Sequence, residues 1–112
     1  MNEKLAVIWT SGDREVALKM VFMYTLNAKI QNWWKDVSLI IWGPSAKLLA
    51  QDEELQQEIR KIKHAGVNIL ACKACADSYN VTFNLNRLGA NVIYMGQPLT
   101  DMLKADAKVL SF

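Results

Sequence analysis

The chain has 112 residues, of which 52% are hydrophobic and 21% charged, and its formal net charge is +2 with basic and acidic residues intermixed. This length and composition predict one folded domain, residues 1–112, that buries a core without disulfides or metals. There is no basic stripe to contact phosphates and no apolar run of about eighteen residues, so we expect no nucleic acid and no membrane as partner. The first residues lack the pattern of a secretory signal, which predicts a cytoplasmic protein with reduced thiols.

Five short apolar runs are predicted to be strands buried on both faces, because they are rich in Val, Ile and aromatic residues and mostly lack alternation. They are LAVIW (5–9), VSLIIW (37–42), VNILA (67–71), NVIYM (91–95) and KVLSF (108–112). Segments of helical character lie between them. The alternation predicts an α/β fold, a three-layer α/β/α sandwich with a five-stranded, mostly parallel sheet, and leaves the direction of the last strand open.

Two predicted helices differ in how they distribute apolar residues. The helix at about 13–31 is apolar on nearly every side, which indicates that both the sheet and a second subunit cover it. Trp33 and Trp34 either fold back over it or anchor that interface. The segment DEELQQEIRKIKHAG has Asp52 as a helix cap and one apolar stripe for the sheet. The stripe consists of Leu55, Ile59 and Ile62.

Turn and capping residues, such as Ser45, follow the predicted strands and lead into helices. In an open parallel sheet the carboxyl ends of the strands share one edge, where ligands bind. We therefore expect a binding site at this edge, beside the cysteines. Its other predicted residues are Thr10, Ser11, Gly12, Gly43, Pro44, Lys73 and Gly96.

Cys72 and Cys75 are the only cysteines in the chain, and they follow the third predicted strand. Cys72 should end the strand and Cys75 should fall in the first helical turn, where free N–H groups and Lys73 lower the pKa of a thiol. The pair is a candidate nucleophilic site, although cysteine is also a common buried residue. A thiol–disulfide redox couple and half of a zinc site are the other interpretations.

Several site classes are disfavoured by what the sequence lacks. His64 is the only histidine, so a zinc site would be short of ligands within one chain, and we expect no metal. Neither a dinucleotide-binding glycine pattern nor a P-loop is present, so we expect no cofactor. A thioredoxin-like pair would follow an early strand, whereas this pair follows the third.

The succession of VIWTSGD, LIIWGPSAKLLA, AGVNILACKACADSYNV and LGANVIYMGQPLTDMLK resembles the DsrE/DsrF-like family over essentially the whole chain. The resemblance implies a cytoplasmic homo-oligomer, a trimer or hexamer. It also implies a sulfurtransferase-like role in sulfur relay, in which Cys72 carries a persulfide and a sulfur-donor or acceptor protein is the partner. Cys75 would be an additional thiol that resolves the persulfide. Asn80 stands where the family often has glycine, and asparagine tolerates the left-handed turn.

A different class of function competes with sulfur relay. The chain would then be a non-catalytic oligomer that binds a small molecule or has a regulatory role, and its cysteines would merely be buried. The two interpretations differ in the reactivity that they predict for the thiols. A thiol–disulfide redox protein with a CxxC pair is the least favoured of the three interpretations.

Overall fold

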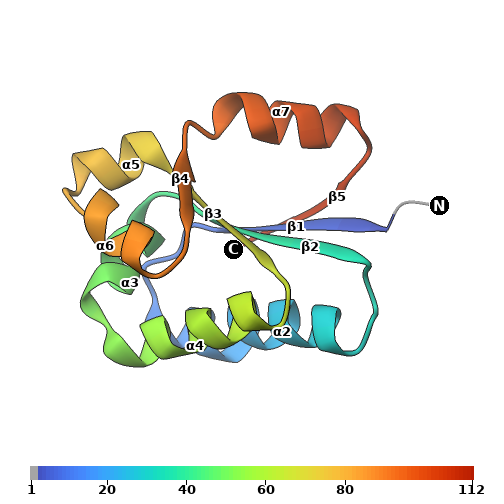
Figure 1. The fold of residues 1–112 in the computed structure, drawn as a ribbon, viewed down its shortest axis with the longest axis horizontal. Helices are drawn as coiled ribbons and strands as arrows, with labels where there is room; N and C mark the ends of the chain where they lie inside the picture. Colours follow the sequence, from blue (N-terminus) through green and yellow to red (C-terminus); the bar gives the residue numbers. More distant parts are fainter. Residues whose placement is uncertain (1–2) are drawn as a thin grey trace.

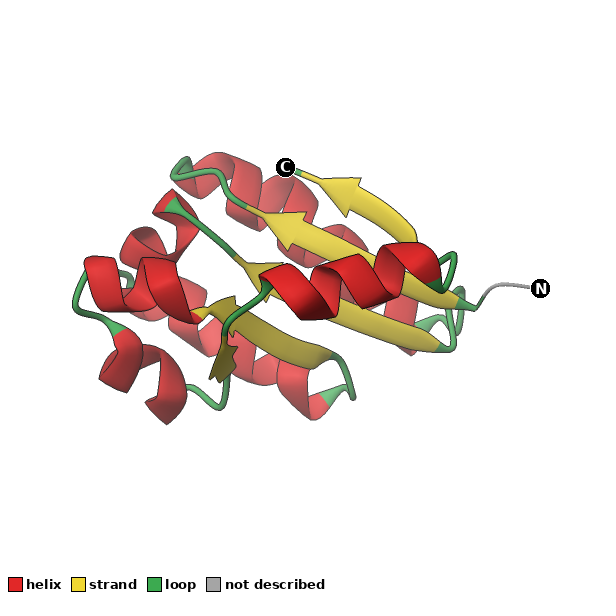
Figure 2. Ribbon diagram, turned by 90° about the horizontal axis from the view of Figure 1, so that it is seen from above, coloured by secondary structure: helices red, strands yellow, loops and turns green. Residues whose placement is uncertain are grey.

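The computed structural model describes residues 3–112 and contains a five-stranded sheet in which all neighbouring strands are parallel. In spatial order the strands are β4 (Asn91–Ile93), β3 (Asn68–Cys72), β2 (Asp36–Ile41), β1 (Lys4–Trp9) and β5 (Lys108–Ser111). The predicted α/β fold is confirmed, and the last strand is parallel like the others. Because β4 and β5 are the two edge strands, the connection between them crosses the whole sheet (Figures 1 and 2).

The helices lie on both sides of the sheet, with α2 and α4 on one side and α7 on the other (Figure 1). The predicted helix at 13–31 is one unbroken helical run, but its middle is π-helical, which the sequence pattern did not predict. In chain order the helices are α1 (Arg14–Val16), η1 (Ala17–Val21), α2 (Phe22–Ile30), α3 (Pro44–Gln51), α4 (Glu53–His64), α5 (Lys73–Ser78), α6 (Thr82–Arg87) and α7 (Gly96–Lys104).

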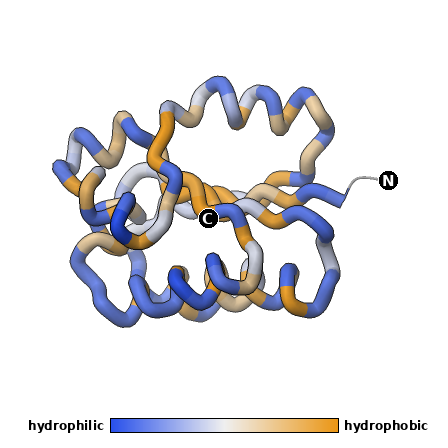
Figure 3. Tube along the Cα trace, in the orientation of Figure 1, coloured by the Kyte–Doolittle hydropathy of each residue, from blue (hydrophilic) through white to orange (hydrophobic). Residues whose placement is uncertain are grey.

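The main core lies between the sheet and the α2–α4 layer. Trp9 at the end of β1 is fully buried and meets Phe22 edge to face, with ring centroids 5.0 Å apart. The predicted stripe of α4 is confirmed, because its three apolar residues are all buried and Asp52 caps the helix by accepting the N–H of Leu55 at 3.1 Å. Figure 3 shows the same division, with hydrophobic strands at the centre and hydrophilic turns on the outside of the helices.

A second, smaller cluster of apolar residues lies on the α7 side of the sheet. Its buried members are Ala6, Ile40, Cys72 and Met95. The helix that covers this side is loosely packed, because none of the residues of α7 is buried. Cys72 therefore belongs to the smaller of the two cores.

The two adjacent tryptophans have different environments. Trp34 packs against the main core, and its indole N–H donates to the hydroxyl of Tyr24 at 3.2 Å. Trp33 is 58% exposed. Trp34 thus folds back over the first helix, while the ring of Trp33, although largely exposed, also lies 6.0 Å from that of Tyr24. Asn80 has φ 59°, so the left-handed turn predicted at this position is confirmed.

Replacing Ile59 by alanine should lower the free energy of unfolding by about 2–5 kcal/mol, because the change removes buried methyl and methylene groups and leaves a cavity. Lys61→Ala is the matched control on the outer face of α4 and should change stability by no more than about 0.5 kcal/mol. Urea denaturation followed by circular dichroism measures both. Equal losses in the two variants would contradict the packing described for α4.

Candidate functional site

The loops that follow β1 and β2 are tied together at the carboxyl edge of the sheet by Ser45. This residue is fully buried, and its hydroxyl donates to the carbonyl of Trp9 and accepts the N–H of Trp42 at 3.2 Å. Its own N–H donates to the carbonyl of Thr10 at 3.1 Å. Ser45 therefore joins two loops, which is more than the capping role that its sequence position predicts.

Gly12, Gly43 and Pro44 lie where these two loops touch. A Cβ added to Gly12 would stand 3.4 Å from the Cβ of Pro44. Gly43 has φ 77° and ψ −142°, a backbone conformation that is close to exclusive to glycine. Its backbone N–H acts to lower the pKa of the Cys75 thiol. The structure thus brings Gly43 to the cysteines, while Pro44 lies against Gly12.

Thr10 and Ser11 also lie at this edge, but their polar atoms are used within the chain. The hydroxyl of Thr10 donates to the carbonyl of Phe112 at 2.8 Å, and the N–H groups of both residues donate to the same carbonyl, at 2.7 Å and 3.2 Å. The hydroxyl of Ser11 accepts the N–H of Asp13 at 3.0 Å. These contacts fasten the segment after β5 to the end of β1, so both residues shape the edge of the sheet.

Cys72 and Cys75 are both free thiols and pack in the same apolar cluster. As predicted, Cys72 ends β3 and Cys75 falls in the first turn of α5. Cys72 is only 5% exposed, whereas Cys75 is half-buried against the same apolar cluster. Cys75 is thus the thiol more open to solvent.

The environment of Cys75 raises the pKa of its thiol. Burial is the largest cause and the hydrogen bond with Cys72 adds to it, while the N–H of Gly43 acts in the opposite direction. The prediction of a lowered thiol pKa is therefore wrong for Cys75, because burial outweighs the nearby amide. A raised pKa favours the protonated thiol in the folded state, so this contribution to stability is complete below the pKa of an unfolded cysteine. It is lost as pH rises through the folded pKa.

Lys73 pairs with a carboxylate of its own helix. Its ammonium lies 3.0 Å from Oδ2 of Asp77 and 5.8 Å from the ring centroid of Tyr94. Asp77 also accepts the hydroxyl of Thr82, and this hydrogen bond, followed by the one from Lys73, lowers the pKa of the carboxyl group. The positive charge that the sequence analysis places beside the thiols is therefore largely balanced by Asp77.

Gly96 begins α7 and is exposed, with open space where a Cβ would stand. Its neighbour Met95 is the residue that packs in the cluster with Cys72. The sequence analysis missed Met95 as a site residue, although its place at the end of an apolar run was an available signal. It also missed the half-buried residues that pack around this cluster, which include Ile8, Trp42 and Ile93.

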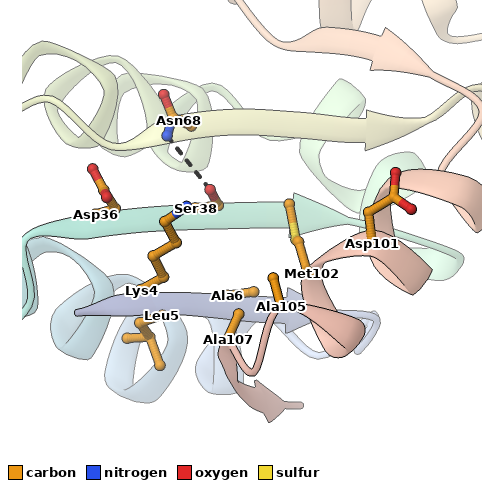
Figure 4. Close-up of a pocket in the computed structure, with 10 residues that line it drawn as sticks. All are labelled: Lys4, Leu5, Ala6, Asp36, Ser38, Asn68, Asp101, Met102, Ala105 and Ala107. Atoms are coloured by element: carbon orange, nitrogen blue, oxygen red, sulfur yellow. Dashed lines mark hydrogen bonds between the residues drawn. The ribbon is translucent and has the colours of Figure 1, made fainter. Parts of the chain in front are cut away.

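A separate hollow of about 500 Å³ lies between α7 and the amino-terminal half of the sheet (Figure 4). Its polar lining includes Asp36, Ser38, Asn68 and Asp101, and the amide of Asn68 donates to the hydroxyl of Ser38 at 3.5 Å. This hollow is at the end of the strands opposite to the cysteines. We place the candidate site at the cysteines because nucleophilic side chains are found there.

Within residues 3–112 no three His, Cys, Asp or Glu side chains converge to hold a metal ion. No helix in the same part of the chain has the length and apolar character needed to cross a bilayer.

Comparison with known proteins places the fold among small α/β proteins. The model of the DsrE/DsrF-like family matches residues 3–112. A solved structure titled as a conserved protein of unknown function, BT1422 from Bacteroides thetaiotaomicron, is 40% identical with a TM-score of 0.95, covering 98% of this chain and 95% of that one. The search of curated proteins gave no match.

Two further solved structures are similar at lower identity and show the fold alone. The ychN protein from E. coli is 17% identical with a TM-score of 0.75, and 100% of each chain is covered. MTH1491 from Methanobacterium thermoautotrophicum, a protein of unknown function, is 12% identical with a TM-score of 0.77, covering 97% of this chain and 99% of that one.

Replacing Gly43 by alanine should destabilise the fold by about 1–3 kcal/mol, because alanine is strained at this backbone conformation. A shifted Gly43 amide would also stabilise the Cys75 thiolate less, so Cys75 should be alkylated more slowly near pH 8. Gly96→Ala is the matched control, since its Cβ meets open space. Thermal denaturation and peptide mapping after iodoacetamide treatment measure the two effects. A Gly43 variant as stable and as reactive as the control would contradict the role given to this amide.

Proposed function

Because the chain belongs to the DsrE/DsrF-like family and holds two free thiols in one apolar cluster at the carboxyl edge of its sheet, we propose that it relays sulfur. Cys72 is the persulfide carrier in this proposal and Cys75 is the resolving thiol. The observation that carries the proposal is the thiol pair itself, set in an apolar cluster and touched by the N–H of Gly43.

The first step is an exchange of sulfane sulfur. The Cys72 thiolate attacks the outer sulfur of a donor persulfide, R–S–SH, and the S–S bond of the donor breaks. The donor leaves as a thiolate and takes up the proton that Cys72 gave up, so Cys72 ends as Cys–S–SH. No net oxidation occurs, because one persulfide is consumed and one is formed.

Two routes can remove the sulfur from Cys72. An acceptor thiolate can take the outer sulfur and leave Cys72 as a thiol. Alternatively, Cys75 attacks the inner sulfur, which forms a Cys72–Cys75 disulfide and releases hydrogen sulfide. The second route requires two equivalents of a reducing thiol to restore the pair. The position of both thiols at the start of α5, in one apolar cluster, supports it.

The two thiols differ in burial. Cys72 is shielded by Ala6, Ile40 and Met95, which would protect a bound persulfide from water and from chance reductants. Cys75 is reached more easily, and burial raises the pKa of its thiol, which makes it a weaker nucleophile near neutral pH. The shielding of Cys72 supports it as the carrier, and the greater exposure of Cys75 suits the thiol that acts later.

Incubation of the reduced protein with a cysteine desulfurase and cysteine, or with thiosulfate, should add about 32 Da per sulfur atom bound, as measured by intact-mass spectrometry. Cys72→Ser should abolish the added mass. Cys75→Ser should still load but should release its sulfur more slowly, because the resolving disulfide cannot form.

Cyanide treatment is the control for this experiment, since it removes sulfane sulfur as thiocyanate and should return the mass to that of the unloaded protein. Peptide mapping should locate the added sulfur on Cys72. Loading that persists in Cys72→Ser, or that maps to Cys75, would reverse the assignment of the two thiols. A complete lack of loading would reject sulfur relay.

A non-catalytic ligand-binding role is the second candidate, and the hollow beneath α7 favours it. A volume of about 500 Å³ with a few polar groups, such as Ser38 and Asn68, is within the size range of small-molecule sites. This role predicts that the thiols stay unreactive in the folded protein. The mass-spectrometric experiment therefore separates the two candidates.

We also propose that the chain assembles into a trimer or hexamer through the outer face of the first helix. Met20, Met23 and Ile30 are 42–56% exposed and follow one another on this face at helical spacing. Trp33, just after the end of α2, is 58% exposed. Burying such a stripe against another copy is favourable because it removes apolar area from water.

Sedimentation analysis at micromolar concentration should give the mass of three or six chains. Ile30→Glu should shift the protein to smaller species, because it places a charge in the interface. Leu103→Glu is the matched control, since Leu103 is 54% exposed and lies on α7. A wild-type monomer, or equal shifts in both variants, would contradict this interface.

A further inference from the structure

The apolar cluster around Cys72 limits how a sulfur donor can reach its thiol. Cys72 is 5% exposed, and the other buried members of the cluster are Ala6, Ile40 and Met95. Thiol exchange requires the attacking and attacked sulfurs to approach directly, so a covered thiol reacts only after its cover moves. The proposed relay therefore requires one wall of the cluster to open.

The wall that can move is the one connected to α7. Ala6 and Ile40 lie on β1 and β2, two inner strands that are paired on both sides and cannot shift without breaking the sheet. Met95 lies outside the strands, at the N-cap of α7, and is 1% exposed. Met102, on α7 itself, packs against the same cluster. Figure 2 shows α7 lying across this face of the sheet, so a movement of the helix would uncover the cluster.

The packing of α7 on the sheet is weak. None of its residues is buried, and Leu103 is 54% exposed. The hollow of about 500 Å³ lies between the second half of the helix and the strands β1 and β2 (Figure 4). On the other side of the sheet α4 buries three apolar residues. An element that buries as little apolar surface as α7 opens locally well before the whole domain unfolds.

A detached α7 would also lose its helical structure. The helix has 9 residues, and helices shorter than about 12 residues are marginal in water without packing. Met95 provides no side-chain cap for the amino end, and Gly96, the first helical residue, has open space around it. The opening of α7 is therefore a local unfolding event, which amide exchange and thiol reactivity both report.

We propose that α7 is a lid over Cys72, and that Met95 is the residue that covers the sulfur. The lid unfolds locally to let a donor or acceptor reach Cys72, and it folds back to shield the persulfide. This inference rests on the sulfur-relay function proposed above and adds the step that controls access to the carrier. The opening itself does not depend on a loaded persulfide, so it can be measured separately.

Amide hydrogen exchange of the reduced wild-type protein, followed by NMR, tests the opening. After correction for intrinsic rates, the amides of residues 100–104 in α7 should exchange at least about a hundredfold faster than those of residues 59–62 in α4. The reason is that α7 opens alone, whereas the centre of α4 is exposed only when the domain unfolds. Equal protection of the two helices would overturn the proposal.

Alkylation by iodoacetamide tests whether α7 is the cover. In a Cys75→Ser background Cys72 is the only thiol, and its reaction rate reports the fraction of open protein. Thr100 is exposed on α7 and is not a member of the cluster. Thr100→Gly should raise the rate about fivefold over Thr100→Ala, because glycine weakens the helix without touching Cys72. Met95→Ala should raise the rate about tenfold or more, because it removes the cover itself.

Lys61→Gly and Lys61→Ala form the matched control pair on the exposed face of α4, and Cys72 should react at equal rates in the two. Equal rates in the two Thr100 variants, or a difference of the same size in the Lys61 pair, would overturn the lid. So would alkylation of Cys72 as fast as that of a free thiol in the otherwise wild-type protein. Persulfide loading is followed in parallel by intact-mass spectrometry. Local opening of α7 without loading would reject sulfur relay and keep the lid, whereas loading with equal alkylation of the Thr100 variants would do the reverse.

Discussion

The buried hydroxyl of Ser45 is the contact on which the geometry of the cysteine site depends. It bonds the carbonyl of Trp9 at the end of β1 and the N–H of Trp42 after β2. A buried hydroxyl left without partners costs about 1–3 kcal/mol, so the two loops are held at a fixed separation. That separation sets Pro44 against Gly12 and places the Gly43 amide where it acts to lower the pKa of the Cys75 thiol.

The thiol pair shows how burial and hydrogen bonding compete at one site. An amide that donates to sulfur stabilises the thiolate, while an apolar cluster around the same sulfur destabilises it. Burial has the larger effect on Cys75, so its thiol is kept protonated until pH rises or the environment changes.

The two faces of the sheet are covered unequally. Parallel sheets are normally packed on both faces, and α4 meets that requirement with three buried residues. No residue of α7 is buried, and beneath it Ser38 and Asn68 face a hollow. Towards the carboxyl ends the same face becomes apolar around Cys72 and Met95. The cysteine site is therefore lined by apolar side chains and lies on the side of the sheet that has the smaller core.

The sequence by itself determined the fold class, the α4 stripe and cap, the turn at Asn80 and the place of both cysteines, because each follows from local periodicity or from a single backbone requirement. Only the tertiary structure decided how those parts act on one another. The π-helical turns at 17–21, the link through Ser45 and the pairing of Lys73 with Asp77 depend on which groups meet in space. For the same reason the predicted lowering of the Cys75 pKa is wrong. The helix turn that would lower this pKa is visible in the sequence, whereas the burial that raises it comes from residues on other strands.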